Sequence, residues 1–72
     1  MIEEEELRKC FDVLRELVGR ETQREQDYHA LAGTYQKDDP ARNDVRRMER
    51  AAHKRVEQIR AVILLLIKEY GV

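Results

Sequence analysis

Two short segments of the sequence pair a glutamate with a histidine at a spacing that suits metal coordination. They read Glu25-Gln-Asp-Tyr-His29 and Glu49-Arg-Ala-Ala-His53, so each is a Glu-x-x-x-His pattern. On a helix, residues i and i+4 lie on one face, so each segment would present a carboxylate and an imidazole together. Helical bundles hold iron, manganese or zinc with these groups, contributed by facing helices. The candidate metal ligands of this chain are therefore Glu25, His29, Glu49 and His53.

The pattern resembles the metal motif of ferritin-like di-iron proteins, in which the spacing is Glu-x-x-His. Here the spacing is one residue longer, and the resemblance extends to no other motif. Because 40% of the residues are charged, the same side chains can also form simple ion pairs on a solvated surface. We therefore expect no cofactor as the first interpretation and a divalent metal as the alternative.

A second candidate site is a group of basic residues in the second half of the chain. Arg46, Arg50 and Lys54 follow one another at i, i+4 and i+8, so on a helix they would form a ridge that could track phosphates. No aromatic residue lies on this ridge to stack on bases, and the chain as a whole has a formal net charge of -1. Nucleic-acid binding is therefore the second alternative, ranked behind a metal site.

The thiol of Cys10 is the remaining reactive group, and it belongs to the only cysteine. It falls within an apolar stripe, has acidic neighbours and has no histidine near it, so we predict a buried structural thiol. A single cysteine also excludes an internal disulfide. Because the sequence contains no catalytic triad and no phosphate-binding loop, we predict that the chain is not an enzyme.

These residues belong to two predicted helices, in which apolar residues recur every three or four positions. We predict a first helix over about residues 3–36 and a second over about residues 40–70. Gly33 is a point at which the first helix could end early, and Gly71 is a plausible stop for the second.

The chain reverses at Lys37-Asp38-Asp39-Pro40, where Asp39 is suited to cap the second helix and Pro40 to occupy its first position. A connection this short makes the two helices antiparallel neighbours. Residues 1–72 are therefore predicted to form a single all-α domain, a two-helix hairpin.

Heptad positions, counted with Leu7 and Val45 at position a, describe the predicted packing. Both apolar stripes occupy a and widen onto e, so we predict that a second hairpin docks on the e side. Reversal at residues 38–39 would pair residues whose numbers add to about 80, which places Glu21 opposite Ile59. The predicted interface consists of Phe11, Leu14, Val18, Ile59, Ile63, Leu64, Leu66 and Ile67.

The length of the chain predicts association. Seventy-two residues lie near the lower limit for independent folding, and one helix–helix seam buries too little apolar surface for a stable monomer. Residues 61–67 are apolar on every side of the helix, so a partner must cover them. We predict a coiled-coil-like four-helix bundle, formed as a homodimer or homotetramer.

The function expected from these features is protein–protein interaction: a small assembly or adaptor module that self-associates and can take a further protein partner. The longest apolar run, residues 61–67, is too short to cross a bilayer, so no membrane partner is expected. The first residues are acidic, whereas a signal peptide begins basic and continues apolar. Together with the lone thiol, this predicts a cytoplasmic protein.

Overall fold

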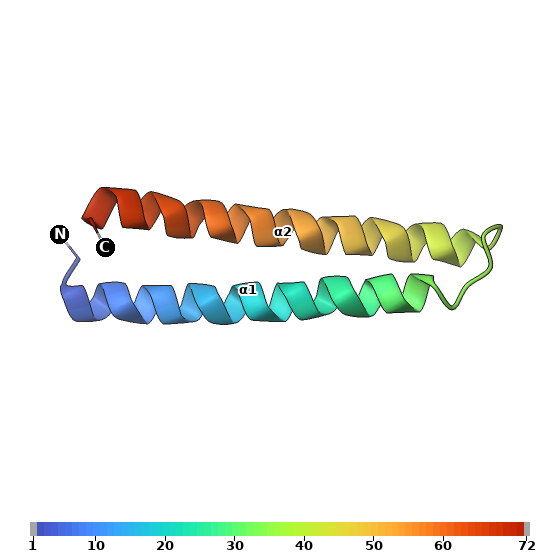
Figure 1. Cartoon of the computed structure of the whole chain (residues 1–72), viewed down its shortest axis with the longest axis horizontal. Helices are drawn as coiled ribbons and strands as arrows, with labels where there is room; N and C mark the ends of the chain where they lie inside the picture. The colour runs from blue at the N-terminus through green and yellow to red at the C-terminus, as the bar shows by residue number, and fades with distance from the viewer. Residues whose placement is uncertain (1, 72) are drawn as a thin grey trace.

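A computed structural model of the chain describes residues 2–71, which fold as two helices packed side by side (Figure 1). α1 spans Glu4–Ala32 and α2 spans Pro40–Tyr70, and the described residues contain no strand. The helices are antiparallel, so the start of α1 and the end of α2 lie at the same end of a rod that measures 53 × 15 × 13 Å. The prediction of an all-α pair of packed helices is confirmed.

Both ends of α2 lie where the sequence predicted them. Asp39 is the N-cap residue, and its side chain accepts a hydrogen bond of 2.9 Å from the backbone N–H of Ala41. Pro40 follows at the first turn, where its missing N–H leaves no helical bond unmade. Gly71 ends the helix with a φ of 67°, a left-handed conformation that glycine adopts without a steric penalty.

The first helix ends earlier than the predicted boundary at residue 36, and its last residue is Ala32. Gly33 weakens the helix at this point because glycine loses more backbone entropy than other residues on becoming helical. Thr34 then closes the helix, since its hydroxyl donates a 2.6 Å hydrogen bond and its backbone N–H a 3.0 Å bond to the carbonyl of Leu31. The predicted boundary was therefore wrong, and the early stop at Gly33 is what occurs.

The seam between the helices is built from heptad positions a and e. The buried apolar residues are Leu7, Val45 and Ala52 at a, and Phe11, Ala32 and Val56 at e. The large apolar residues at position d are exposed instead. Cys10 is also at d and is exposed, so the prediction of a buried thiol was wrong.

The register of the two helices differs from the predicted one. Cross-helix contacts join His29 to Glu49 and Glu25 to His53, pairs whose numbers add to 78. Glu21 accepts a hydrogen bond from Arg55, and there the numbers add to 76. Because α1 ends early, the midpoint of the chain reversal moves toward the N-terminus and lowers these sums below the predicted value.

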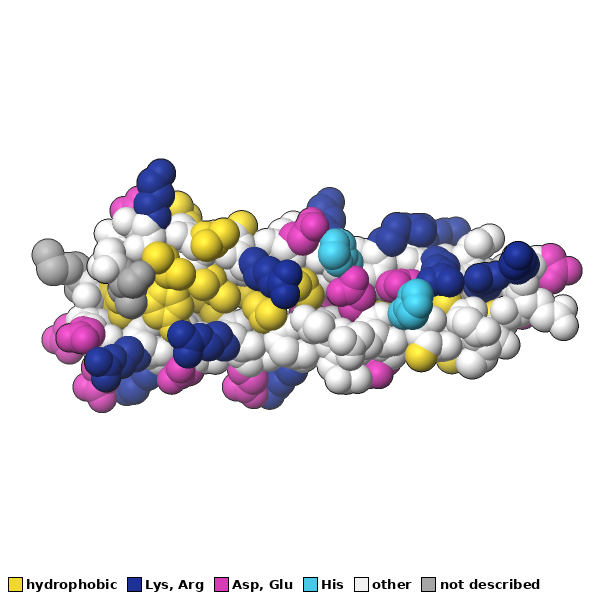
Figure 2. All heavy atoms as spheres, viewed as in Figure 1, with side chains coloured by type: hydrophobic (Ala, Val, Ile, Leu, Met, Phe, Trp, Pro, Cys, Tyr) yellow, Lys and Arg dark blue, Asp and Glu magenta, His cyan; other side chains and the backbone are white. Residues whose placement is uncertain are grey.

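Apolar side chains are concentrated in the open half of the hairpin, residues 2–19 and 58–71, which contains both helix ends remote from the turn. Figure 2 shows them as yellow spheres gathered toward this end with charged side chains around them, whereas few yellow spheres lie near the turn and the two histidines lie toward the middle. Leu64 is the most exposed of the large apolar residues, at 66%. In the described part of the chain, neither helix is apolar over a length sufficient to span a membrane.

Candidate functional site

One face of the hairpin carries both histidines, and we call it the polar face. His29 and His53 occupy position b of their helices, beside the seam, and carboxylates lie between them in Figure 2. The structure brings these histidines together with Glu25 and Glu49, as the sequence predicted. The contacts, however, run between helices: His29 Nδ1 is 2.8 Å from Glu49 Oε2, and His53 Nδ1 is 2.8 Å from Glu25 Oε1.

The ring of His53 is held between two carboxylates. Its Nδ1 faces Glu25 of α1, and its Nε2 lies 3.1 Å from Oε1 of Glu57, one turn further along α2. A carboxylate can only accept hydrogen bonds, so both contacts are hydrogen bonds only when both ring nitrogens carry protons. The hydrogen bond with Glu25, together with the charges of both carboxylates, raises the pKa of His53.

The neighbouring pair of His29 and Glu49 includes an arginine. Arg46 Nη1 donates to Glu49 Oε1 at 2.8 Å and lies 3.2 Å from His29 Nδ1. The hydrogen bond from this guanidinium is the main reason that the pKa of Glu49 is lowered, and desolvation opposes the shift. The cation therefore occupies the space between two of the predicted metal ligands.

The position of Arg46 opposes metal binding by Glu49 and His29. A metal held by Glu49 and His29 would have to displace Arg46, because two cations at that distance repel each other. Within residues 2–71, no group of three or more histidine, cysteine, aspartate or glutamate side chains is arranged to hold an ion. As it stands, the cluster forms two cross-helix His–Glu contacts that join α1 to α2, and metal binding stays a prediction.

The basic ridge predicted on α2 is interrupted by acidic side chains. Arg46 is bonded to Glu49, and Arg50 borders the same hollow as Glu25 and His53. Only Lys54 of the predicted ridge lies apart from this hollow, and it is exposed. The ridge is thus part of a mixed-charge surface, and nucleic-acid binding also stays a prediction.

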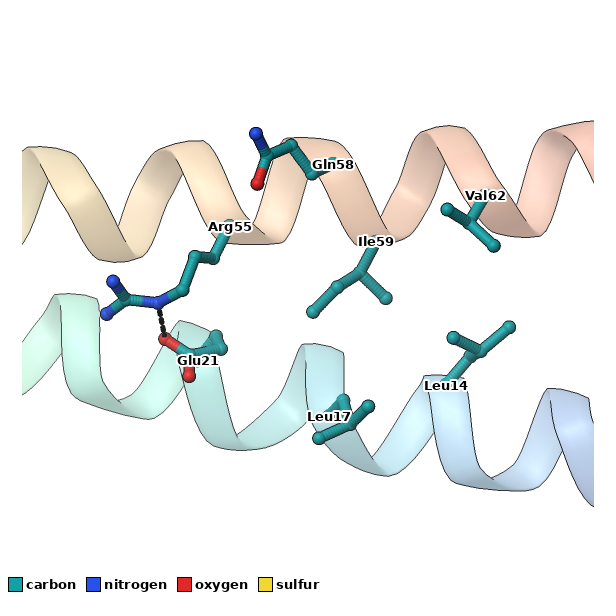
Figure 3. A pocket seen from close by; sticks show the side chains of 7 residues that line it. All are labelled: Leu14, Leu17, Glu21, Arg55, Gln58, Ile59 and Val62. Carbon is teal, nitrogen blue, oxygen red and sulfur yellow. Dashed lines mark hydrogen bonds and ion pairs between the residues drawn. The ribbon is translucent and has the colours of Figure 1, made fainter.

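The opposite side of the seam, which we call the apolar face, carries a shallow groove between the helices (Figure 3). Leu14, Leu17, Ile59 and Val62 line most of it, and Gln58 lies at its edge. In Figure 3 the side chain of Leu14 projects from α1 toward Val62, and that of Ile59 projects from α2 toward α1.

An ionic cluster closes the end of this groove. Glu21 is only 9% exposed and accepts hydrogen bonds from Arg55 of α2 at 2.8 Å and from Arg24 of its own helix at 3.1 Å. The sequence placed a charge at this core position but did not reveal its partner. The presence of arginine at the d positions nearest Glu21 on both helices was the available signal.

The residues predicted to form the interface have different environments. Phe11 is buried inside the hairpin, and Leu64 and Ile67 are exposed. The half-buried ones, which line the seam, are Leu14, Val18, Ile59, Ile63 and Leu66. The exposed large apolar residues that the prediction omitted include Val13, Leu17, Val62 and Leu65. The interface prediction concerns a second molecule, and it stays a prediction.

No known protein family, curated protein or solved structure matches this chain. Its function is therefore inferred from the two faces of the hairpin and from the amount of surface that the fold leaves exposed.

Proposed function

We propose that the chain is a self-associating helical hairpin that serves as an assembly or adaptor module. The observation that carries this proposal is the surface area of the hairpin, 5818 Å² for 8.6 kDa. A compact monomer of this mass exposes about 4,700 Å². The excess of about 1,100 Å² is comparable with the ~800 Å² that each partner contributes to a standard protein–protein interface.

The core supports the same proposal. Six apolar residues are buried in the described chain, and two of them, Ala32 and Ala52, have almost no side chain to contribute. The radius of gyration is 16.3 Å, whereas a compact domain of this length has one of about 11 Å. A second hairpin packed against the first would supply the missing core as a four-helix bundle.

Metal binding is the alternative proposal. It is favoured by the gathering of Glu25, His29, Glu49 and His53 on one face, and it is opposed by Arg46. The two proposals differ in what holds the assembly together. An assembly based on apolar contact keeps its oligomeric mass when metals are removed. An assembly that depends on a bound metal dissociates.

Multi-angle light scattering on the purified chain tests the proposed function. We expect a dimer or a larger even-numbered assembly at micromolar concentration, with the same mass in chelator and at high salt. A monomer of 8.6 kDa that is fully helical and melts cooperatively would overturn the proposal. An assembly that falls apart in chelator would support the metal alternative.

A further inference from the structure

The d and g positions of both helices form a second strip, separate from the a/e seam. At about 100° per residue, the two strips are centred about 110° apart around each helix, close to the right angle between neighbours in a square four-helix bundle. In the middle of the open half the strip is apolar and exposed: Val13 56%, Leu17 38%, Val62 45% and Leu65 57%. The groove of Figure 3 runs along this strip.

The charges along the strip are ordered. From residue 3 to residue 24, the d and g residues of the first helix and its N-cap are, in sequence, acidic, apolar and basic: Glu3, Glu6, Cys10, Val13, Leu17, Arg20 and Arg24. Asp27 and Leu31 follow them toward the turn. The α2 strip runs from base to acid along the chain: Arg55, Gln58, Val62, Leu65 and Glu69. The charges of each strip are therefore complementary to those of a second copy of the same strip that runs in the opposite direction. The centre of this pairing lies near Val13 on α1 and at Val62 on α2. These two centres lie at the same level of the hairpin, because Leu14 and Val62 border one groove.

We propose that two copies dock antiparallel and staggered through this strip, α1 against α1 and α2 against α2, with the two-fold axis at the level of Val13 and Val62. This inference rests on the proposed function and specifies its partner surface. It places Glu3 of each copy at the level of Arg24 in the other copy, and Glu69 at the level of Arg55. Apolar residues of the two copies meet around the axis.

The basic end of the strip carries positive charge that Glu21 does not fully neutralise. Arg24 and Arg55 both bond to Glu21, so two guanidinium charges face one carboxylate and the cluster has a net charge of +1. Both arginine side chains are partly exposed, at 59% and 44%. The acidic first turn of a second copy would balance this charge.

Other arrangements match the surface less well. Parallel docking would bring the acidic first turns, Glu3 to Glu6, of the two copies together. Full antiparallel overlap would cover the apolar open halves with the charged turn halves, which desolvates charges without pairing them. Docking on the opposite face would meet the arginines at position b in the open half, Arg8, Arg15 and Arg60, and Figure 2 shows cations bordering the apolar seam there.

The native Cys10 gives a direct test by disulfide formation. In the proposed arrangement, Cys10 lies about 10 Å along the helix axis from its own copy, too far for a disulfide, but at the level of Leu17 in the other copy. Mild oxidation of the Leu17→Cys variant should therefore give a covalent dimer on a non-reducing gel. The wild-type chain and the Arg15→Cys variant, altered on the opposite face, should stay uncrosslinked.

Each contrary result has its own meaning. Efficient crosslinking of wild-type chains through Cys10 would show parallel docking and overturn the inference. Absence of the covalent dimer in Leu17→Cys, with the dimeric mass retained in solution, would also overturn it while leaving the proposed function intact. A monomeric wild-type chain in light scattering would remove the proposed function itself.

Discussion

At the scale of single residues, the two histidines of the polar face differ in the hydrogen-bond partners that surround each ring. His29 Nδ1 lies near both a carboxylate oxygen of Glu49 and a guanidinium nitrogen of Arg46. This nitrogen can therefore donate a hydrogen bond to Glu49 when it carries a proton, and it can accept one from Arg46 when it carries none. His53 faces a carboxylate with each nitrogen, so loss of a proton leaves one carboxylate against a lone pair.

This difference predicts a pH dependence of stability that involves His53. Its pKa is raised in the folded chain, so its contribution is complete below the unfolded pKa of about 6.5 and is lost as the pH rises through the folded pKa. The urea midpoint of the wild type should thus be higher at about pH 5.5 than at about pH 8, relative to the His53→Gln variant, which cannot take up the proton.

The matched control for this experiment is His29→Gln, measured at the same protein concentration. It should keep the part of the pH dependence that His53 contributes, because it leaves the contacts of His53 with Glu25 and Glu57 in place. Equal pH profiles for the wild type and His53→Gln would contradict the prediction.

The position of Arg46 leads to a prediction about metals. After treatment with chelator, addition of Zn(II), Fe(II) or Mn(II) should leave the melting temperature of the wild type unchanged, because the guanidinium already neutralises Glu49. The comparison variant is Arg46→Ala, in which this cation is absent. A rise in the wild-type melting temperature that His29→Ala and His53→Ala each abolish would instead establish a metal site.

At the scale of the elements, the start of α2 depends on one side chain. Asp39→Ala removes the acceptor for the Ala41 N–H and should lower the stability by about 1 kcal/mol. For a domain of this size, that corresponds to a fall in melting temperature of roughly 4–8 °C. Asp38→Ala, one residue earlier, removes the same charge without touching this cap, and it should have little effect. Equal losses from both variants would show that charge, not capping, is responsible.

The helix ends show what local sequence signals can and cannot predict. Asp39 acts through its capping side chain, and Pro40 and Gly71 act through their own backbone preferences, so the sequence predicted α2 correctly. The end of α1 depends on a competition between a weak helix former, Gly33, and an apolar spacing that continues to Tyr35. Thr34 decides this competition by bonding back to Leu31, and the sequence pattern did not reveal that contact.

The heptad positions that form the seam were less predictable than the positions of the helices in the sequence. A spacing of three and four residues fits an a/d stripe and an a/e stripe equally well, so periodicity alone could not say which side would face inward. Packing through d would have brought Arg24 and Arg55 into the core. Packing through e buries Phe11 and Val56 and lets both arginines reach Glu21 from the edge.

The same limit applied to the candidate metal ligands. Their gathering on one face followed from the heptad positions and was predicted correctly. Their partners depended on the register between the helices, which pairs His29 with Glu49 and His53 with Glu25. Arg46, which decides the character of the site, carried no distinguishing signal among the many charged residues.

At the scale of the whole molecule, the proposed assembly predicts that one charge on the apolar face has a large effect. Val62→Glu leaves the a/e seam intact but places a glutamate beside its own copy at the proposed two-fold axis, where a buried unpaired charge costs several kcal/mol. We expect the mass in light scattering to fall to that of the monomer and the helical signal in circular dichroism to weaken.

Arg60→Glu is the control for this substitution, because it changes charge on the same helix but at position b of the opposite face. It should leave the assembly unchanged. An intact assembly in the Val62→Glu variant would place the interface elsewhere, whereas dissociation by Arg60→Glu would point to the polar face.

In the connection at residues 33–39, the two side-chain bonds each stay within one helix, and one backbone bond of 3.1 Å, from the N–H of Asp39 to the carbonyl of Gln36, joins the two sides. Thr34 bonds back to α1, and Asp39 bonds forward to α2. A cut between Lys37 and Asp38 would leave both side-chain contacts within their own fragments and would separate Asp39 from Gln36, so the connection acts mainly as a tether that sets an effective concentration. The chain divided there would behave as two separate peptides. Proteins fused to the two new ends could control the reassociation of the peptides by bringing those ends together.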